Sequence, residues 1–106
     1  MTLHPVIARV YHAINPNFGF PSTKNPDPVW PLDFEIVAEV TVDGDTDEQF
    51  AIDMAFEKTN TINRHWSLNP EVKAVKTDAR STAVGDIVKI NGHLYRCELV
   101  GWSRIE

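Results

Sequence analysis

Residues 84–102 read Val-Gly-Asp-Ile-Val-Lys-Ile-Asn-Gly-His-Leu-Tyr-Arg-Cys-Glu-Leu-Val-Gly-Trp, and this stretch decides the fold. Two apolar, β-branched runs flank the Asn-Gly pair at 91–92. Asn and Gly tolerate the positive φ angles that a two-residue type I′ turn requires. The stretch therefore predicts a β-hairpin. Tyr95, Cys97 and Leu99 share one side of its second strand, and we expect that side, including Leu99, to lie in the core.

Three further stretches are typical of β-strands. Residues 6–12 are short and β-branched, and residues 32–42 alternate apolar with mostly polar side chains, as in a sheet with one solvent-facing side. Residues 71–76 also alternate and fit a short edge strand, because lysines discourage edge pairing. The order ββα(β)ββ predicts an α+β fold, an antiparallel sheet of four to five strands with one helix packed on a face.

The helix is predicted over residues 47–58. Thr46 opens a capping box, and acidic residues follow in the first turn, where the helix dipole favours anions. Spacing of three and four residues places Phe50 and Met54 on the inner face. Asn60 is the expected left-handed stop after the last turn.

Length and charge limit the class of protein. The 106 residues fit a single domain, residues 1–106, with 42% hydrophobic and 24% charged residues. No apolar stretch is long enough to cross a membrane and no secretory signal is seen, so we expect a cytoplasmic protein without a membrane partner. The only cysteine, Cys97, excludes an intramolecular disulfide. A net charge of −5 makes nucleic acid an unexpected partner, since phosphate-binding surfaces are usually basic.

Residues 13–31 predict a long loop rich in proline and aromatic residues. Five prolines remove backbone donors and disfavour helix, whereas large aromatic side chains argue against simple disorder. The loop is either an arm packed over one end of the core or a surface that binds a partner through Phe18, Phe20 or Trp30. Further along the chain, Trp66 is expected to anchor the connection after the helix.

The acidic stretch at 43–47 does not complete a metal site. Asp43-x-Asp45-x-Asp47 begins like a calcium loop, but Glu48 and Met54 stand where such a loop needs Gly and a bidentate Glu. The four histidines show no ligand spacing either. We therefore expect no metal and no cofactor.

Ser81 and Thr82 precede Asp86 and resemble a hydroxyl nucleophile beside an acid. No activating base is visible in the sequence, so we interpret the hydroxyl groups as partners of local backbone groups. Arg80 is expected to pair either with Asp86 or with the end of the helix. The sequence therefore predicts no catalytic residue.

Residues 80–102 resemble the C-terminal block of many small proteins encoded by bacteriophages and mobile elements. The residues that carry the resemblance are Arg80-Ser81-Thr82-Ala83-Val84-Gly85-Asp86-Ile87-Val88, then Gly92, Tyr95 and Val100-Gly101-Trp102. The block is also similar to the YodL-like domain of large phage and plasmid proteins, although Ala83 stands where that family commonly has Ser. The resemblance covers about the last half of the chain and carries no established activity. It implies a phage-type accessory protein acting in a bacterial cytoplasm.

These observations predict a non-enzymatic interaction module, with a bacterial host protein as the expected partner. An edge strand could also pair with a partner or with a second copy, giving a homodimer. Two alternatives stay open: a nucleic-acid-associated protein, and a small-ligand-binding or catalytic domain. The candidate partner-binding residues are Phe18, Phe20, Trp30, Arg96 and Trp102.

Overall fold

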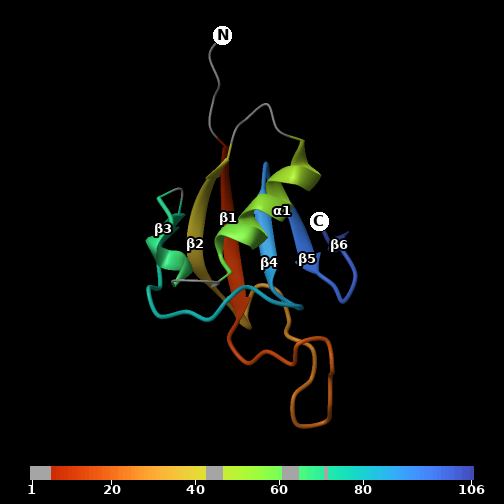
Figure 1. Cartoon of the computed structure of the whole chain (residues 1–106). Helices are drawn as coiled ribbons and strands as arrows, with labels where there is room; N and C mark the ends of the chain where they lie inside the picture. The colour runs from red at the N-terminus through yellow and green to blue at the C-terminus, as the bar shows by residue number, and fades with distance from the viewer. Residues whose placement is uncertain (1–5, 43–46, 61–64, 71) are drawn as a thin grey trace.

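The computed structural model describes residues 6–42, 47–60, 65–70 and 72–106, and in these residues six strands form one antiparallel sheet beneath a single α-helix (Figure 1). The strand order is β3-β2-β1-β4-β5-β6, which confirms the expected α+β fold with one strand more than expected. The elements are β1 (Val6–Ala13), β2 (Phe34–Val42), α1 (Glu48–Lys58), the 3₁₀ turn η1 (Trp66–Leu68), β3 (Val72–Ala74), β4 (Ile87–Ile90), β5 (His93–Cys97) and β6 (Trp102–Arg104).

The predicted hairpin is formed by β4 and β5. Ile90 pairs with His93 across a two-residue turn, and φ is 52° at Asn91 and 80° at Gly92. Both angles are positive, as a type I′ turn requires. Short β3 lies at one edge of the sheet, as its alternation predicted.

The expectation that Leu99 lies in the core is wrong. The chain turns directly after β5, where the Glu98 N–H donates to the Gly101 carbonyl at 3.0 Å, and Gly101 has φ 72°. Leu99 therefore sits in a turn with 64% of its surface exposed. The turn leads into β6, the strand that the sequence reading missed. The alternation ended there because the turn interrupted the strand.

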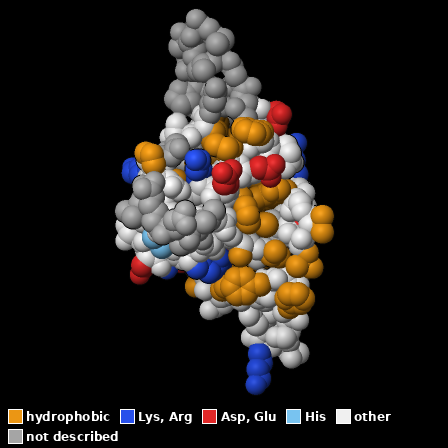
Figure 2. Space-filling view, viewed as in Figure 1, with side chains coloured by type: hydrophobic (Ala, Val, Ile, Leu, Met, Phe, Trp, Pro, Cys, Tyr) orange, Lys and Arg blue, Asp and Glu red, His pale blue; other side chains and the backbone are white. Residues whose placement is uncertain are grey.

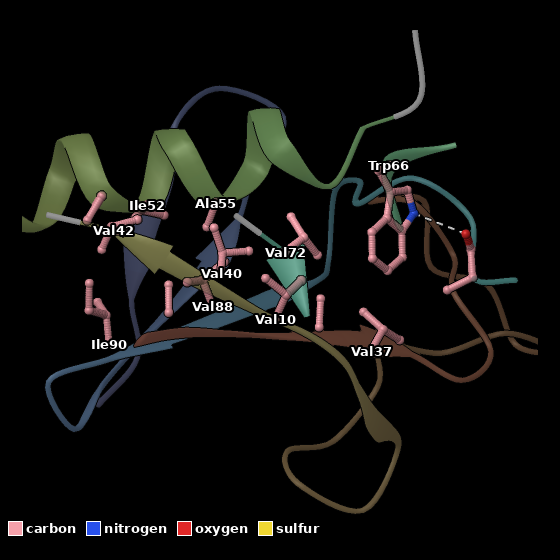
Figure 3. Packing of buried hydrophobic residues seen from close by; sticks show 14 residues of the cluster. Val10, Val37, Val40, Val42, Ile52, Ala55, Trp66, Val72, Val88 and Ile90 are labelled. Atoms are coloured by element: carbon pink, nitrogen blue, oxygen red, sulfur yellow. Dashed lines mark hydrogen bonds between the residues drawn. The ribbon is translucent and has the colours of Figure 1, made fainter. Parts of the chain in front are cut away.

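The hydrophobic core lies between α1 and the sheet (Figure 3). Small side chains on the helix, Ala51 and Ala55, flank the fully buried Ile52. The prediction of Phe50 on the inner face is wrong, because Phe50 is 55% exposed, and Met54 is only half-buried. The sheet contributes Ala8, Val10, Val40, Val42, Val88 and Ile90 to this core.

Two polar side chains account for the rotation of α1 about its axis. At the first turn, Glu48 accepts hydrogen bonds from His93 and Tyr95 of β5. After the last turn, the hydroxyl group of Thr59 bonds to that of Thr82 at 2.6 Å. Residues 48, 52, 55 and 59 follow a helical spacing, so these bonds turn Ile52 toward the sheet.

The helix ends differ in part from the expectation. Asp47 is the N-cap, and its Oδ1 accepts from the Phe50 N–H at 2.9 Å, while Thr46 lies outside the described residues. The left-handed stop at Asn60 is wrong. The helix ends at Lys58, its C-cap Thr59 has φ −109°, and Asn60 has no positive φ. In the described part of the chain, no helix is long and apolar enough to cross a membrane.

The anchor role of Trp66 is confirmed. Its side chain is fully buried, and its indole N–H donates to the carbonyl groups of Ala79 and Arg80. These bonds hold the segment that leads into β4 against the core.

The loop between β1 and β2, residues 14–33, extends beyond the end of the sheet (Figure 1). Trp30 fixes its second half, with its ring 4.8 Å from that of Tyr11 and 5.5 Å from that of Phe34. The first half exposes aromatic side chains, since Phe18 is 44% and Phe20 is 72% exposed. The loop is thus held at one side and open at the other.

Candidate interaction surface

Asp86 is a fully buried carboxylate that ties three segments together. Its two oxygens accept from both terminal nitrogens of Arg80, at 2.6 and 2.8 Å, which confirms the first of the two partners expected for Arg80. They also accept from the backbone N–H groups of Ala13, at 2.9 Å, and of Ala83, at 2.7 Å. Four hydrogen bonds and a paired charge compensate the loss of water around this carboxylate.

A chain of hydroxyl groups lies beside this ion pair. Thr59 donates to the Ala55 carbonyl at 2.7 Å, so its oxygen accepts the proton of Thr82. Thr82 in turn accepts from Nε2–H of His12 at 2.9 Å. Burial is the main cause that lowers the pKa of His12 to about 4, so this ring is neutral near pH 7. We call Arg80, Asp86, His12, Thr82 and Thr59 the Asp86 clasp.

The clasp does not have the geometry of a catalytic triad. The nearest approach of Asp86 to His12 is 3.8 Å, and it is to Nε2, the same nitrogen that bonds Thr82. A triad needs the acid on the other ring nitrogen, where it orients the base. His12 and Thr82 are each only 2% exposed, so a substrate has no access to the hydroxyl group. In this arrangement Arg80, Thr82 and Asp86 therefore have a structural role.

Cys97 and the possible metal ligands were the other candidates for reactive chemistry. Cys97 is buried, and burial raises the pKa of its thiol to about 11, which keeps it protonated and unreactive near pH 7. Among the described residues, no three His, Cys, Asp or Glu side chains are grouped so as to hold a metal ion. Asp43 and Asp45 of the calcium-like stretch lie outside those residues.

The structure separates the five candidate partner-binding residues into three places. Trp30 and Arg96 line a pocket of about 200 Å³ between the 14–33 loop and the sheet face opposite the helix. Trp102 lies on the helix side, while Phe18 and Phe20 are exposed on the loop. The guanidinium group of Arg80 lies 5.2 Å from the centre of the Phe18 ring.

Trp102 forms one wall of an open groove between α1 and β6. Its ring meets that of Phe56 edge-on at 6.0 Å, and its indole N–H donates to Asp53 at 3.2 Å. Val84 and Leu99 complete the apolar lining. We call this feature the α1–β6 groove.

The 14–33 loop adjoins this groove at Gly19. A Cβ atom on Gly19 would lie 2.9 Å from Val84 and 3.4 Å from Leu99, so the loop backbone packs directly against the groove lining. This contact brings the backbone between Phe18 and Phe20 to the edge of the groove, and both of these side chains are exposed. Figure 2 shows hydrophobic side chains gathered in a band that runs from the helix toward the loop.

Sequence reasoning missed Leu99 and Val100 as surface residues, and it did not assign the half-buried Phe56 to a site. The signal for the first two was Gly101, because Gly is favoured at the last position of a turn and here follows Glu-Leu-Val. The signal for Phe56 was its position off the predicted inner stripe of the helix.

Comparison of the chain with protein-family models, curated proteins and solved structures returned no match. The resemblance of residues 80–102 to phage-encoded proteins therefore stays a prediction. No family membership is assigned to the chain, and its function has to be inferred from the surface described above.

Proposed function

We propose that this protein is a non-enzymatic interaction module, a phage-type accessory protein that binds a bacterial protein through the α1–β6 groove and the part of the 14–33 loop around Gly19. The observation that carries the proposal is the exposure of large apolar side chains around Trp102. Leu99 is 64% and Val100 is 92% exposed, and the loop that carries the exposed Phe18 and Phe20 packs against Val84 and Leu99 through Gly19.

Exposed apolar groups in one contiguous region are a mark of binding surfaces, because single scattered ones are the rule elsewhere. Aromatic residues such as Trp and Phe are also those that dominate protein interfaces. The groove carries Asp53 and Glu98, which disfavour a nucleic-acid phosphate at this place. A protein partner therefore fits the groove better than DNA or RNA.

Capture of partners from a bacterial lysate tests the proposal. Tagged wild-type protein, a Leu99→Glu variant and a Leu32→Glu variant are compared, with and without nuclease. Leu32 is 82% exposed on the loop and does not line the groove, so it is a matched control. Captured proteins are identified and purified, and their binding to the three forms is then measured directly.

We expect wild-type protein and Leu32→Glu to bind the same protein with equal affinity and Leu99→Glu to bind it at least about tenfold more weakly. Nuclease should change nothing. Loss of capture after nuclease treatment, or equal binding by the Leu99→Glu variant, would contradict the proposal.

A further inference from the structure

We infer that the α1–β6 groove binds an extended partner segment that pairs with β6 and places a Lys or Arg side chain, flanked by apolar ones, against Trp102. This inference rests on the proposed function and names the chemistry of the partner. Three observations carry it: the free backbone edge of β6, the position of the groove beside that edge, and the charges that line the groove.

The outer edge of β6 offers unpaired backbone groups. The Glu98 N–H donates to Gly101 at 3.0 Å and the Ile105 N–H donates to Leu94 at 2.8 Å, which sets the register of the β5–β6 ladder. In an antiparallel ladder, every second residue turns its N–H and C=O toward the neighbouring strand. Ser103 therefore bonds inward, and Trp102 and Arg104 turn their backbone groups outward, where no described strand follows.

The opposite edge of the sheet is less suited to pairing. β3 and β6 are both three residues long, but Lys73 and Lys76 bring two positive charges to the β3 edge, against Arg104 alone on β6. Charged residues on a short strand discourage the addition of another strand. The β6 edge is therefore the one that we assign to the partner.

The groove lies where the side chains of an added strand would point. Trp102 pairs with Cys97 and faces the helix side of the sheet, as its contacts with Phe56 and Asp53 of α1 show. Alternate side chains of a strand paired with β6 would point to the same side. They would lie against Phe56, Leu99 and Trp102, so backbone pairing and side-chain burial occur together.

The charge of the groove selects a cationic side chain. Asp53 and Glu98 line it, whereas Lys and Arg are absent from its lining. Hydrogen bonds from Ser103 and Arg96 lower the pKa of Glu98, but Arg96 also pairs with its charge at 3.0 Å, so Asp53 is the carboxylate that carries the preference for a cation. The aromatic face of Trp102 adds a cation–π partner for Lys or Arg. The net charge of −5 favours the approach of a basic segment from a distance.

Labelled synthetic peptides test the inference by fluorescence anisotropy at low and physiological salt. The first peptide has nine residues, and every second residue is Thr. The residues between the Thr positions include Val, Lys and Val in that order, so these three side chains point to the same side of the strand. A second peptide has Glu in place of Lys, and a third carries N-methyl groups on the backbone nitrogens that would pair with β6. Asp53→Asn removes the charge but keeps an oxygen for the Trp102 indole, and Asp78→Asn, exposed and away from the groove, is the control.

We expect the Lys peptide to bind about tenfold or more tightly than the Glu peptide, and the N-methylated peptide to bind at least about tenfold more weakly. Asp53→Asn should remove most of the preference for Lys, and Asp78→Asn should keep it. The preference should weaken as salt rises, because the groove is open to solvent.

Several results would overturn the inference. Equal binding of the Lys and Glu peptides would remove its charge component, and equal binding of the N-methylated peptide would remove strand pairing. Failure of all three peptides to bind, while Leu99→Glu still weakens capture from lysate, would overturn the inference and leave the proposed function standing. Sedimentation could also show that the protein is a dimer and that Arg104→Pro makes it a monomer. A second copy of the chain would then occupy the β6 edge, and the inference would be overturned.

Discussion

Residues 80–86 and residues 98–102 lie close together and are treated by the fold in opposite ways. The first segment contains an arginine and an aspartate, and Asp86 is fully buried. The second contains Leu99 and Val100, which are 64% and 92% exposed. Hydropathy alone would place the first segment outside and the second inside.

The difference shows what decides burial in this protein. Asp86 is buried because four donors reach its two oxygens, so its desolvation is compensated. Leu99 is exposed because a turn closed by Glu98 and Gly101 takes the chain away from the core. A buried charge with full hydrogen bonding indicates a structural role, whereas exposed apolar groups indicate a contact yet to be made.

The largest expected effect comes from breaking the Asp86 clasp. Asp86→Asn removes the charge that Arg80 pairs with and leaves the guanidinium group without a counter-charge. We expect a loss of about 3–5 kcal/mol in the free energy of unfolding, measured by urea denaturation. Asp78→Asn, at an exposed site, should change it by less than about 0.5 kcal/mol. A loss below about 1 kcal/mol for Asp86→Asn would mean that the clasp is not structural.

The next largest effect is a pH dependence that comes from His12. Its pKa is about 4 in the folded protein and 6.5 in the unfolded chain, so acid favours unfolding. The contribution of His12 to the free energy of unfolding is fully present above pH 6.5 and is lost as the pH falls toward 4. The loss is about 2 kcal/mol at pH 5. Denaturation curves between pH 7 and pH 5 check this. His12→Gln keeps an N–H donor for Thr82 without a titration, and it should flatten the profile.

A smaller effect is expected at the turn between β4 and β5, which joins the two segments. Gly92 has φ 80°, a conformation that β-branched residues resist. Gly92→Val should cost about 1–2 kcal/mol. No atom lies within 4 Å of a Cβ at this position, so the cost is conformational and not a clash. An unchanged melting temperature would contradict the type I′ turn.

The smallest effect on stability is expected at the exposed segment. Leu99→Asp should change the free energy of unfolding by less than about 0.5 kcal/mol, because the site faces solvent. Leu94→Asp is the matched comparison, since Leu94 is only 3% exposed on β5 and the change should cost about 3 kcal/mol or more. Thermal melts of the two variants check this. Equal losses in both would mean that the turn at Leu99 packs into the core.

The sequence predicted those features that local chemistry determines. The Asn-Gly pair at 91–92 predicted the hairpin, because few other residues accept its φ angles. Arg80 was expected to pair either with Asp86 or with the helix end, and the structure selects Asp86. The buried anchor at Trp66 was also predicted correctly.

Features that depend on tertiary contacts were not predictable in the same way. The rotation of α1 is set by Glu48 and Thr59. Glu48 bonds to Tyr95, 47 residues along the chain, and Thr59 bonds to Thr82, 23 residues along the chain. Phe50 was therefore assigned to the wrong face. β6 was missed because the alternation of β5 was continued through Leu99, across the turn that Glu98 and Gly101 close.

The candidate site was predicted only in part. Trp102 lines the α1–β6 groove, whereas Trp30 and Arg96 line a neighbouring pocket, and Phe18 and Phe20 flank Gly19, whose backbone packs against Val84 and Leu99. Proline and aromatic content identified the loop, but the face on which each ring lies depends on how the loop folds back. The face of each ring depends on contacts between residues far apart in the chain, and no local sequence pattern encodes these contacts.

Glu48 fastens the start of α1 to the middle of β5, and hydrogen bonds from His93 and Tyr95 lower its pKa to about 2. This junction therefore stays ionised well into acid. One wall of the groove belongs to α1 and the other to β6, which follows β5. The distance between the two walls is therefore fixed before a partner binds. A receptor prepared in this way loses little conformational entropy on association. The partner segment would bind to a preformed groove, and the conformational entropy that this segment loses on binding would limit the affinity.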